Sequence, residues 1–114
     1  MKDEDFLDMI PKRLCEHESN QDLITVLYFK KPTIIEKLFF RKMINKPYKI
    51  DLDEIGSFIW GQINAVSTIR EIIDISKKHF GEKVEPAQDR VLTFFRQMYG
   101  TKLIMLYQKV VEQS

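Results

Sequence analysis

Cysteine and histidine, which most often act as nucleophiles and metal ligands, are scarce in this chain of 114 residues. Cys15 is the single cysteine, and the two histidines, His17 and His79, are far apart and outside any CxxC or HxxxH pattern. Cys15 and His17 could imitate a nucleophile and its base, but a strand thiol beside a solvent-facing histidine is the simpler interpretation. A zinc site needs about four such ligands at defined spacing. The sequence therefore predicts no metal site.

A second candidate for chemistry is the group of carboxylates at Asp51, Asp53 and Glu54, where a helix is expected to begin. Carboxylates there accept hydrogen bonds from unpaired backbone N–H groups and complement the helix dipole, which explains them better than acid–base catalysis does. The chain contains no GxGxxG, GxxxxGK[ST] or GxSxG motif. We therefore expect a binding protein with no enzymatic activity and no cofactor.

The composition is that of one soluble globular domain. Hydrophobic residues make up 44% and charged residues 31%, and 18 Lys and Arg against 17 Asp and Glu leave a net charge of +1. So small an excess gives no general electrostatic attraction to nucleic acid. No apolar run approaches the roughly 18 residues of a membrane-spanning helix. The N-terminus is acidic, unlike a signal peptide, so we expect a cytoplasmic protein.

The first half of the chain is expected to form the strands. Residues 1–9 are acidic and are predicted to be flexible. A short strand is expected within 11–18, and the apolar run over 23–29 predicts a strand covered on both faces. Over 48–52, apolar and charged residues alternate, which predicts a half-buried strand with its inward residues at Tyr48, Ile50 and Leu52.

Residues 30–46 form a basic amphipathic insertion. Between positions 30 and 49 the chain carries seven Lys or Arg residues and a single acid, Glu36. Thr33, with Glu36 three residues later, resembles a capping box and predicts a helix over 33–46. We expect this helix to pack on the domain; docking on a partner protein or an anionic membrane surface is the alternative.

Three helices are expected in the second half, over 53–64, 68–80 and from Pro86 to Gly100, followed by a short strand over 103–107. Each helix has an apolar stripe at helical spacing, including Ile59, Ile72 and Phe95, and Trp60 is expected in the core. A small antiparallel sheet followed by three helices predicts an α+β fold of the winged helix-turn-helix type.

Residues 52–60 (LDEIGSFIW) and 67–72 (STIREI) resemble the helical core of the coenzyme PQQ synthesis protein D (PqqD) family. Members typically read LDeiGsfvW, then a DG turn, then Tv.eI. The resemblance covers about residues 22–107, and the DG turn is replaced here by Asn64-Ala65. On this resemblance, residues 10–110 are a single PqqD-like peptide-binding domain.

The resemblance implies a peptide chaperone. Such a domain binds the leader of a ribosomally made precursor peptide and presents the core of that peptide to a modifying enzyme, often a radical-SAM protein. The leader is expected to add a strand to the sheet edge and to lie against the third helix. The peptide-binding residues are then expected to be Tyr48, Lys49, Ile50, Asp51, Gln88, Leu92, Arg96 and Tyr99.

Several of these positions have a second interpretation. Leu92 and Tyr99 are either core residues or the floor of the groove, and Lys49 and Arg96 are either solvated or partners of leader carboxylates. Two other functions also stay open. A winged-helix DNA-binding regulator would read DNA with its third helix, although acidic residues there offset the arginines. A scaffold or adaptor subunit would dock through 33–46. The sequence leaves a homodimer open and identifies neither the precursor peptide nor the product.

Overall fold

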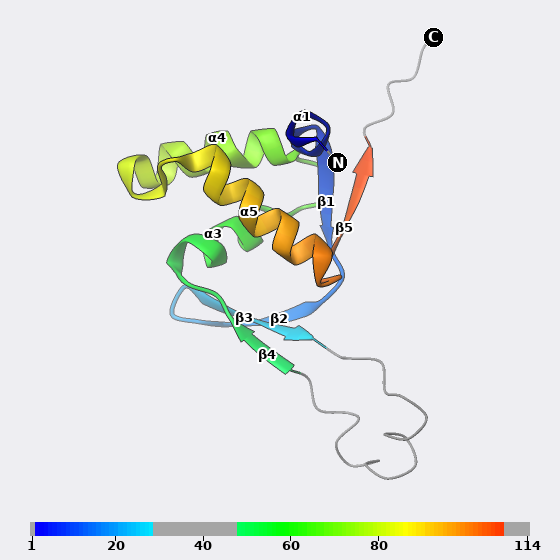
Figure 1. The fold of residues 1–114 in the computed structure, drawn as a ribbon. Helices are drawn as coiled ribbons and strands as arrows, with labels where there is room; N and C mark the ends of the chain where they lie inside the picture. The colour runs from blue at the N-terminus through cyan, green and yellow to red at the C-terminus, as the bar shows by residue number, and fades with distance from the viewer. Residues whose placement is uncertain (1, 29–47, 109–114) are drawn as a thin grey trace.

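The computed structural model describes residues 2–28 and 48–108, so the helix expected over 33–46 lies outside the described residues. The described chain has an α+β architecture, as the sequence predicts (Figure 1). Its elements are, in chain order, α1 (Asp3–Leu7), β1 (Met9–Arg13), β2 (Glu16–Asn20), β3 (Leu23–Tyr28), β4 (Tyr48–Asp51), α3 (Glu54–Gln62), α4 (Ile69–Phe80), the 3-10 helix η1 (Gly81–Val84), α5 (Ala87–Gly100) and β5 (Ile104–Gln108).

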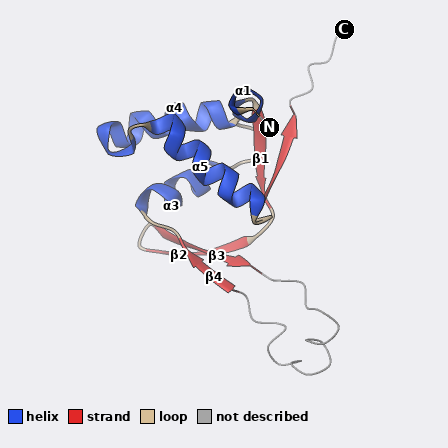
Figure 2. Ribbon diagram, viewed as in Figure 1, coloured by secondary structure: helices blue, strands red, loops and turns tan. Residues whose placement is uncertain are grey.

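The strands form two antiparallel sheets instead of one (Figure 2). β1 pairs with β5 at the end of the chain, and β2, β3 and β4 form a three-stranded sheet in that order. The single strand expected within 11–18 is therefore two strands in different sheets, because the chain leaves the first sheet at Leu14 and Cys15. A helix also precedes the first strand. The winged helix-turn-helix classification stays a prediction.

The three helices of the second half are confirmed within a few residues of their expected bounds. Asp53 caps α3 by accepting a hydrogen bond from the backbone N–H of Gly56 at 2.7 Å. Thr68 and Glu71 form the expected capping box on α4. Gly81 ends that helix with a φ of 59°, a conformation that favours glycine.

The core lies where the three helices meet the inner faces of the two sheets. Trp60 is fully buried, as expected, together with the apolar stripes of α4 and α5. Most of the predicted stripe positions are confirmed as core, while Phe94 is only partly buried. The buried stripe of α5 consists of Val91, Leu92, Phe95 and Met98.

Three expectations for the first half are wrong. Residues 3–7 are helical instead of flexible, and Phe6 and Leu7 are buried in the core. β3 is not covered on both faces: Leu23 is 48% exposed, since the described helices pack on one face of this sheet (Figure 1). Tyr48 does not point inward and is 60% exposed; its ring lies near that of Tyr28, with 6.5 Å between the ring centres.

Candidate functional site

β4 has an open edge. In the antiparallel pairing with β3, the backbone N–H of Leu52 donates to the carbonyl of Ile24 at 2.9 Å, and Ile50 lies opposite Val26. Because hydrogen-bonded pairs alternate along such a ladder, the backbone groups of Ile50 and Leu52 point toward β3. The backbone groups of Lys49 and Asp51 point the other way, away from β3. The described residues place no further strand on that side.

Ser57 fixes helix α3 to this end of the sheet. Its hydroxyl accepts a hydrogen bond from the backbone N–H of Ile24 at 2.8 Å and donates one to the carbonyl of Leu52 at 3.2 Å. The hydroxyl therefore stands between two strands where a direct backbone bond would otherwise form. Because Ser57 is buried, water cannot take the place of its hydroxyl as hydrogen-bond partner of the Ile24 N–H and the Leu52 carbonyl. These two bonds hold the first turn of α3 against the end of β4.

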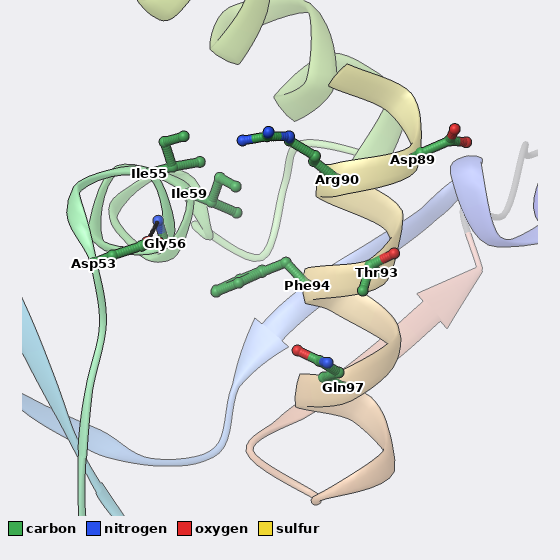
Figure 3. A pocket seen from close by; sticks show the side chains of 9 residues that line it. All are labelled: Asp53, Ile55, Gly56, Ile59, Asp89, Arg90, Thr93, Phe94 and Gln97. Carbon is green, nitrogen blue, oxygen red and sulfur yellow. Dashed lines mark hydrogen bonds between the residues drawn. The ribbon is translucent and has the colours of Figure 1, made fainter. Parts of the chain in front are cut away.

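A pocket of about 390 Å³ lies between α3 and α5. Its apolar part comes from Ile55, Ile59 and Phe94, and polar side chains surround it. Figure 3 shows Arg90, Phe94 and Gln97 pointing from α5 toward α3, whereas Asp89 points away. The lining residues are Asp53, Ile55, Gly56, Ile59, Asp89, Arg90, Thr93, Phe94 and Gln97.

Gly56 is the point at which the pocket and the sheet meet. A Cβ atom at this position would lie 3.3 Å from Cε2 of Phe94, 3.1 Å from Oδ1 of Asp53 and 3.5 Å from Cβ of Leu52. The absence of a side chain therefore lets the Phe94 ring approach α3 closely. Since Leu52 directly follows β4, the pocket lies beside the end of the strand whose edge is free.

Trp60 connects both sheets to α3. The guanidinium of Arg13, on β1, donates to the Trp60 carbonyl from Nε at 3.1 Å and from Nη2 at 2.6 Å. The indole Nε1 donates to Nδ1 of His17, on β2, at 3.1 Å. Burial lowers the pKa of Arg13 from its ordinary value, although the group stays a cation near neutral pH. The tryptophan therefore has a structural role and lies outside the pocket lining.

The resemblance of Cys15 and His17 to a nucleophile and base has no support in the geometry. Burial raises the pKa of the Cys15 thiol, which favours the unreactive protonated form. Nδ1 of His17 already accepts the Trp60 hydrogen bond. Within residues 2–28 and 48–108, no three His, Cys, Asp or Glu side chains gather as metal ligands would. No helix in those same ranges is both long and apolar enough to span a bilayer.

Helix α1 covers the face of α5 that was expected to line the groove. Leu92 is only 4% exposed and belongs to the core. Arg96 forms an ion pair with Asp3, and its guanidinium carbon lies 4.9 Å from the centre of the Phe6 ring. Tyr99 packs edge-on against the same ring, with 6.4 Å between centres. These three positions do not line the pocket, and neither does the exposed Gln88.

The four expected residues on β4 do lie at the open edge. Ile50 is partly buried and packs against the core. Lys49 and Asp51 face the opposite side of the sheet, where Lys49 Nζ is 4.0 Å from Glu18 and Asp51 accepts a hydrogen bond from Thr25 Oγ1 at 2.7 Å. Both charges thus have partners within the sheet, and their contribution to the edge comes from the backbone.

The sequence analysis missed the pocket residues on α5, namely Arg90, Phe94 and Gln97. Helical spacing places Phe94 in the apolar stripe of the third helix, and Arg90 and Gln97 among its outer positions. The sequence does contain one indication that the N-terminal segment packs on the domain. Phe6 and Leu7 form an adjacent apolar pair within an otherwise acidic segment. Both residues are buried, and helix α1, which contains them, covers the face of α5 opposite the pocket.

Comparisons with known proteins give one result. A family model described as coenzyme PQQ synthesis protein D (PqqD) matches residues 45–104. The match includes β4, the three long helices and every residue that lines the pocket. Neither curated proteins nor solved structures give a match.

Proposed function

This chain belongs to the PqqD family, and we propose on that basis that it is a non-catalytic protein that binds the leader of a ribosomally made precursor peptide. The bound peptide is presented to a modifying enzyme, for which a radical-SAM enzyme is our first candidate. The observation that carries the proposal is the open edge of β4 beside the α3–α5 pocket.

The edge and the pocket suit an extended peptide. A peptide strand paired with β4 bonds to the backbone N–H and C=O groups of Lys49 and Asp51. Side chains alternate along a strand, so every second peptide residue points to the face where Ile50 and Leu52 meet the helices. One such side chain would enter the pocket beside Gly56 and pack on Phe94.

Typical interaction energies indicate that an apolar side chain of the leader contributes more to binding than its charges do. Burying one large apolar side chain contributes roughly 1.5–3 kcal/mol, whereas an exposed ion pair contributes only about 0.2–1 kcal/mol. Lys49 and Arg96, the cations expected to select leader carboxylates, already lie beside Glu18 and Asp3. We therefore assign selectivity to an apolar or aromatic leader residue in the pocket.

Two glycines of α3 provide a matched test. In Gly56→Ala the new methyl group crowds Phe94 and narrows the pocket, whereas at Gly61 nothing lies within 4 Å of the added atom. The probe is a peptide selected on this protein from a displayed random library. We expect Gly56→Ala to weaken its binding about tenfold, which corresponds to roughly 1.4 kcal/mol, and Gly61→Ala to leave the affinity unchanged.

Amide chemical-shift mapping with the same peptide locates the site. We expect the largest shifts at Lys49, Asp51, Phe94 and Gln97. Shifts confined to the outer face of α4, or equal losses of affinity in the two glycine variants, would contradict the proposal. Thermal unfolding of both variants checks that the domain stays folded.

DNA binding has less support. On α5, Arg90 points toward α3 (Figure 3), Asp89 adds a negative charge, and Arg96 pairs with Asp3, so this helix offers few cations to phosphates. We expect binding to duplex DNA to be weak and to be lost at physiological salt. Nanomolar binding of a specific duplex at that salt concentration would instead indicate a DNA-binding regulator.

A further inference from the structure

Within the described residues, the two-stranded sheet also has an open edge, at β5. The backbone N–H of Leu14 donates to the carbonyl of Leu103 at 2.9 Å, and Lys12 lies opposite Met105. Hydrogen-bonded pairs alternate along an antiparallel ladder, so Met105 and Tyr107 direct their backbone groups toward β1. The residues whose backbone groups point away from β1 are Ile104, Leu106 and Gln108.

Only one edge of this sheet offers a full set of backbone groups. By the same alternation, Pro11 lies where β1 would present an outward N–H, and proline has none. β5 contains no proline and no charged residue, although exposed edge strands usually carry such residues as protection against pairing. Figure 1 shows β5 on the outer side of the two-stranded sheet.

The outer face of β5 is also apolar. Met105 is 41% exposed and Tyr107 is 42% exposed, and the Tyr107 hydroxyl lies 3.7 Å from the Met105 sulfur. Leu14, on the neighbouring chain segment, is a further exposed apolar residue. An uncharged strand with exposed apolar side chains and unused backbone groups is a surface for strand addition.

We propose that β5 pairs antiparallel with β5 of a second copy of this chain, about a two-fold axis at Leu106. In this register Leu106 lies opposite its own copy and Ile104 lies opposite Gln108, so all the outward backbone groups bond. Met105 then lies opposite Tyr107 of the second copy, a thioether–aromatic contact that forms twice.

The self-complementary register and the absence of like charges across it favour this occupant. The two β5 strands bring no like charges together, and the nearest cation that the described residues place on the outer face is Lys12 of β1. The two copies of Lys12 would be three strand spacings apart, about 14 Å, which exceeds the Debye length of ~8 Å at physiological salt. The peptide groove stays accessible, since β4 belongs to the other sheet. This inference is independent of the proposed peptide function.

Hydrogen exchange tests the register in the unmodified protein. Raising the protein concentration from about 1 μM to 500 μM should slow exchange of the amides of Ile104, Leu106 and Gln108. The amides of Met105 and Tyr107, which already bond to β1, should change little. Sedimentation should show a monomer–dimer equilibrium over the same range. A monomer at every concentration would overturn the proposal, and so would a dimer without this alternating protection.

Charge substitutions test the side-chain contact. Met105→Lys or Tyr107→Glu alone should raise the dimer dissociation constant at least tenfold, because each buries an unpaired charge. The double variant should recover most of the loss, since the introduced ammonium of one copy would face the introduced carboxylate of the other across the axis. Val66→Lys, which alters an exposed apolar residue away from β5, is the control and should keep the wild-type dimer.

A different partner would give a different result. If the wild-type chain is monomeric and Met105→Lys lowers its binding to a modifying enzyme, the edge accepts a strand of that enzyme and the second-copy proposal is wrong. Circular dichroism of each variant confirms folding, and the hydrogen-exchange result does not depend on any variant.

Discussion

Two faces of helix α5 flank its buried stripe; α1 covers one of them, and the other borders the pocket. On one side Arg96 and Tyr99 pack against α1, beside the buried Leu92. On the other side Arg90, Phe94 and Gln97 border the pocket (Figure 3). At about 100° per residue, both sets sit at the same angular distance from Val91, Phe95 and Met98. Helical spacing therefore identifies two candidate faces, and a short segment some ninety residues away decides which one stays open.

The strongest test of this difference is Leu92→Asp. A carboxylate in the core has no partner, so we expect a loss of more than ~4 kcal/mol, which is a large part of the roughly 5–15 kcal/mol by which folded domains are stable. Urea denaturation measures the loss, and Gln88→Asp, exposed on the same helix, should cost less than ~0.5 kcal/mol. A folded Leu92→Asp protein that no longer binds peptide would place Leu92 in the groove and reverse the comparison.

Removing the side chain that covers this face should have the next largest effect. Phe6→Ala deletes a buried ring that contacts both Arg96 and Tyr99, and we expect it to cost about 3 kcal/mol. Asp5→Ala, at an exposed neighbouring position, is the control and should change little. If the two variants have equal unfolding midpoints, α1 does not close this face.

The sequence predicts the helices better than the site, and the residues show why. Caps at Asp53, Thr68 and Gly81 act within one turn, so their signals lie next to the structure they produce. The motif over 52–60 combines such a local cap with long-range contacts, since Gly56 admits the Phe94 ring and Ser57 accepts a hydrogen bond from the backbone of Ile24. The open face of α5 depends instead on Phe6, which reads as part of an acidic, flexible end until its long-range contact is known.

The pocket side should respond in binding more than in stability. Phe94 is partly buried and forms the apolar wall of the pocket, so Phe94→Ala should weaken the library-selected peptide about tenfold, or roughly 1.4 kcal/mol. Its stability should fall by less than that of Phe6→Ala, because solvent already reaches the ring. Isothermal titration and urea denaturation measure the two quantities separately. Unchanged affinity together with a large loss of stability would make Phe94 an ordinary core residue.

The smallest effect is expected at Arg96, and it separates the two faces most directly. Both members of its pair with Asp3 are substantially exposed, so solvent screens the interaction and Arg96→Gln should cost only about 0.2–1 kcal/mol of stability. A double-mutant cycle with Asp3→Asn should assign that cost to the pair, and 1 M salt should reduce it. Peptide affinity should stay unchanged, because the guanidinium lies over Phe6 on the covered face. A tenfold loss of affinity with no change in stability would mean that Arg96 binds a leader carboxylate, and α5 would then recognise peptide with the face that α1 packs against.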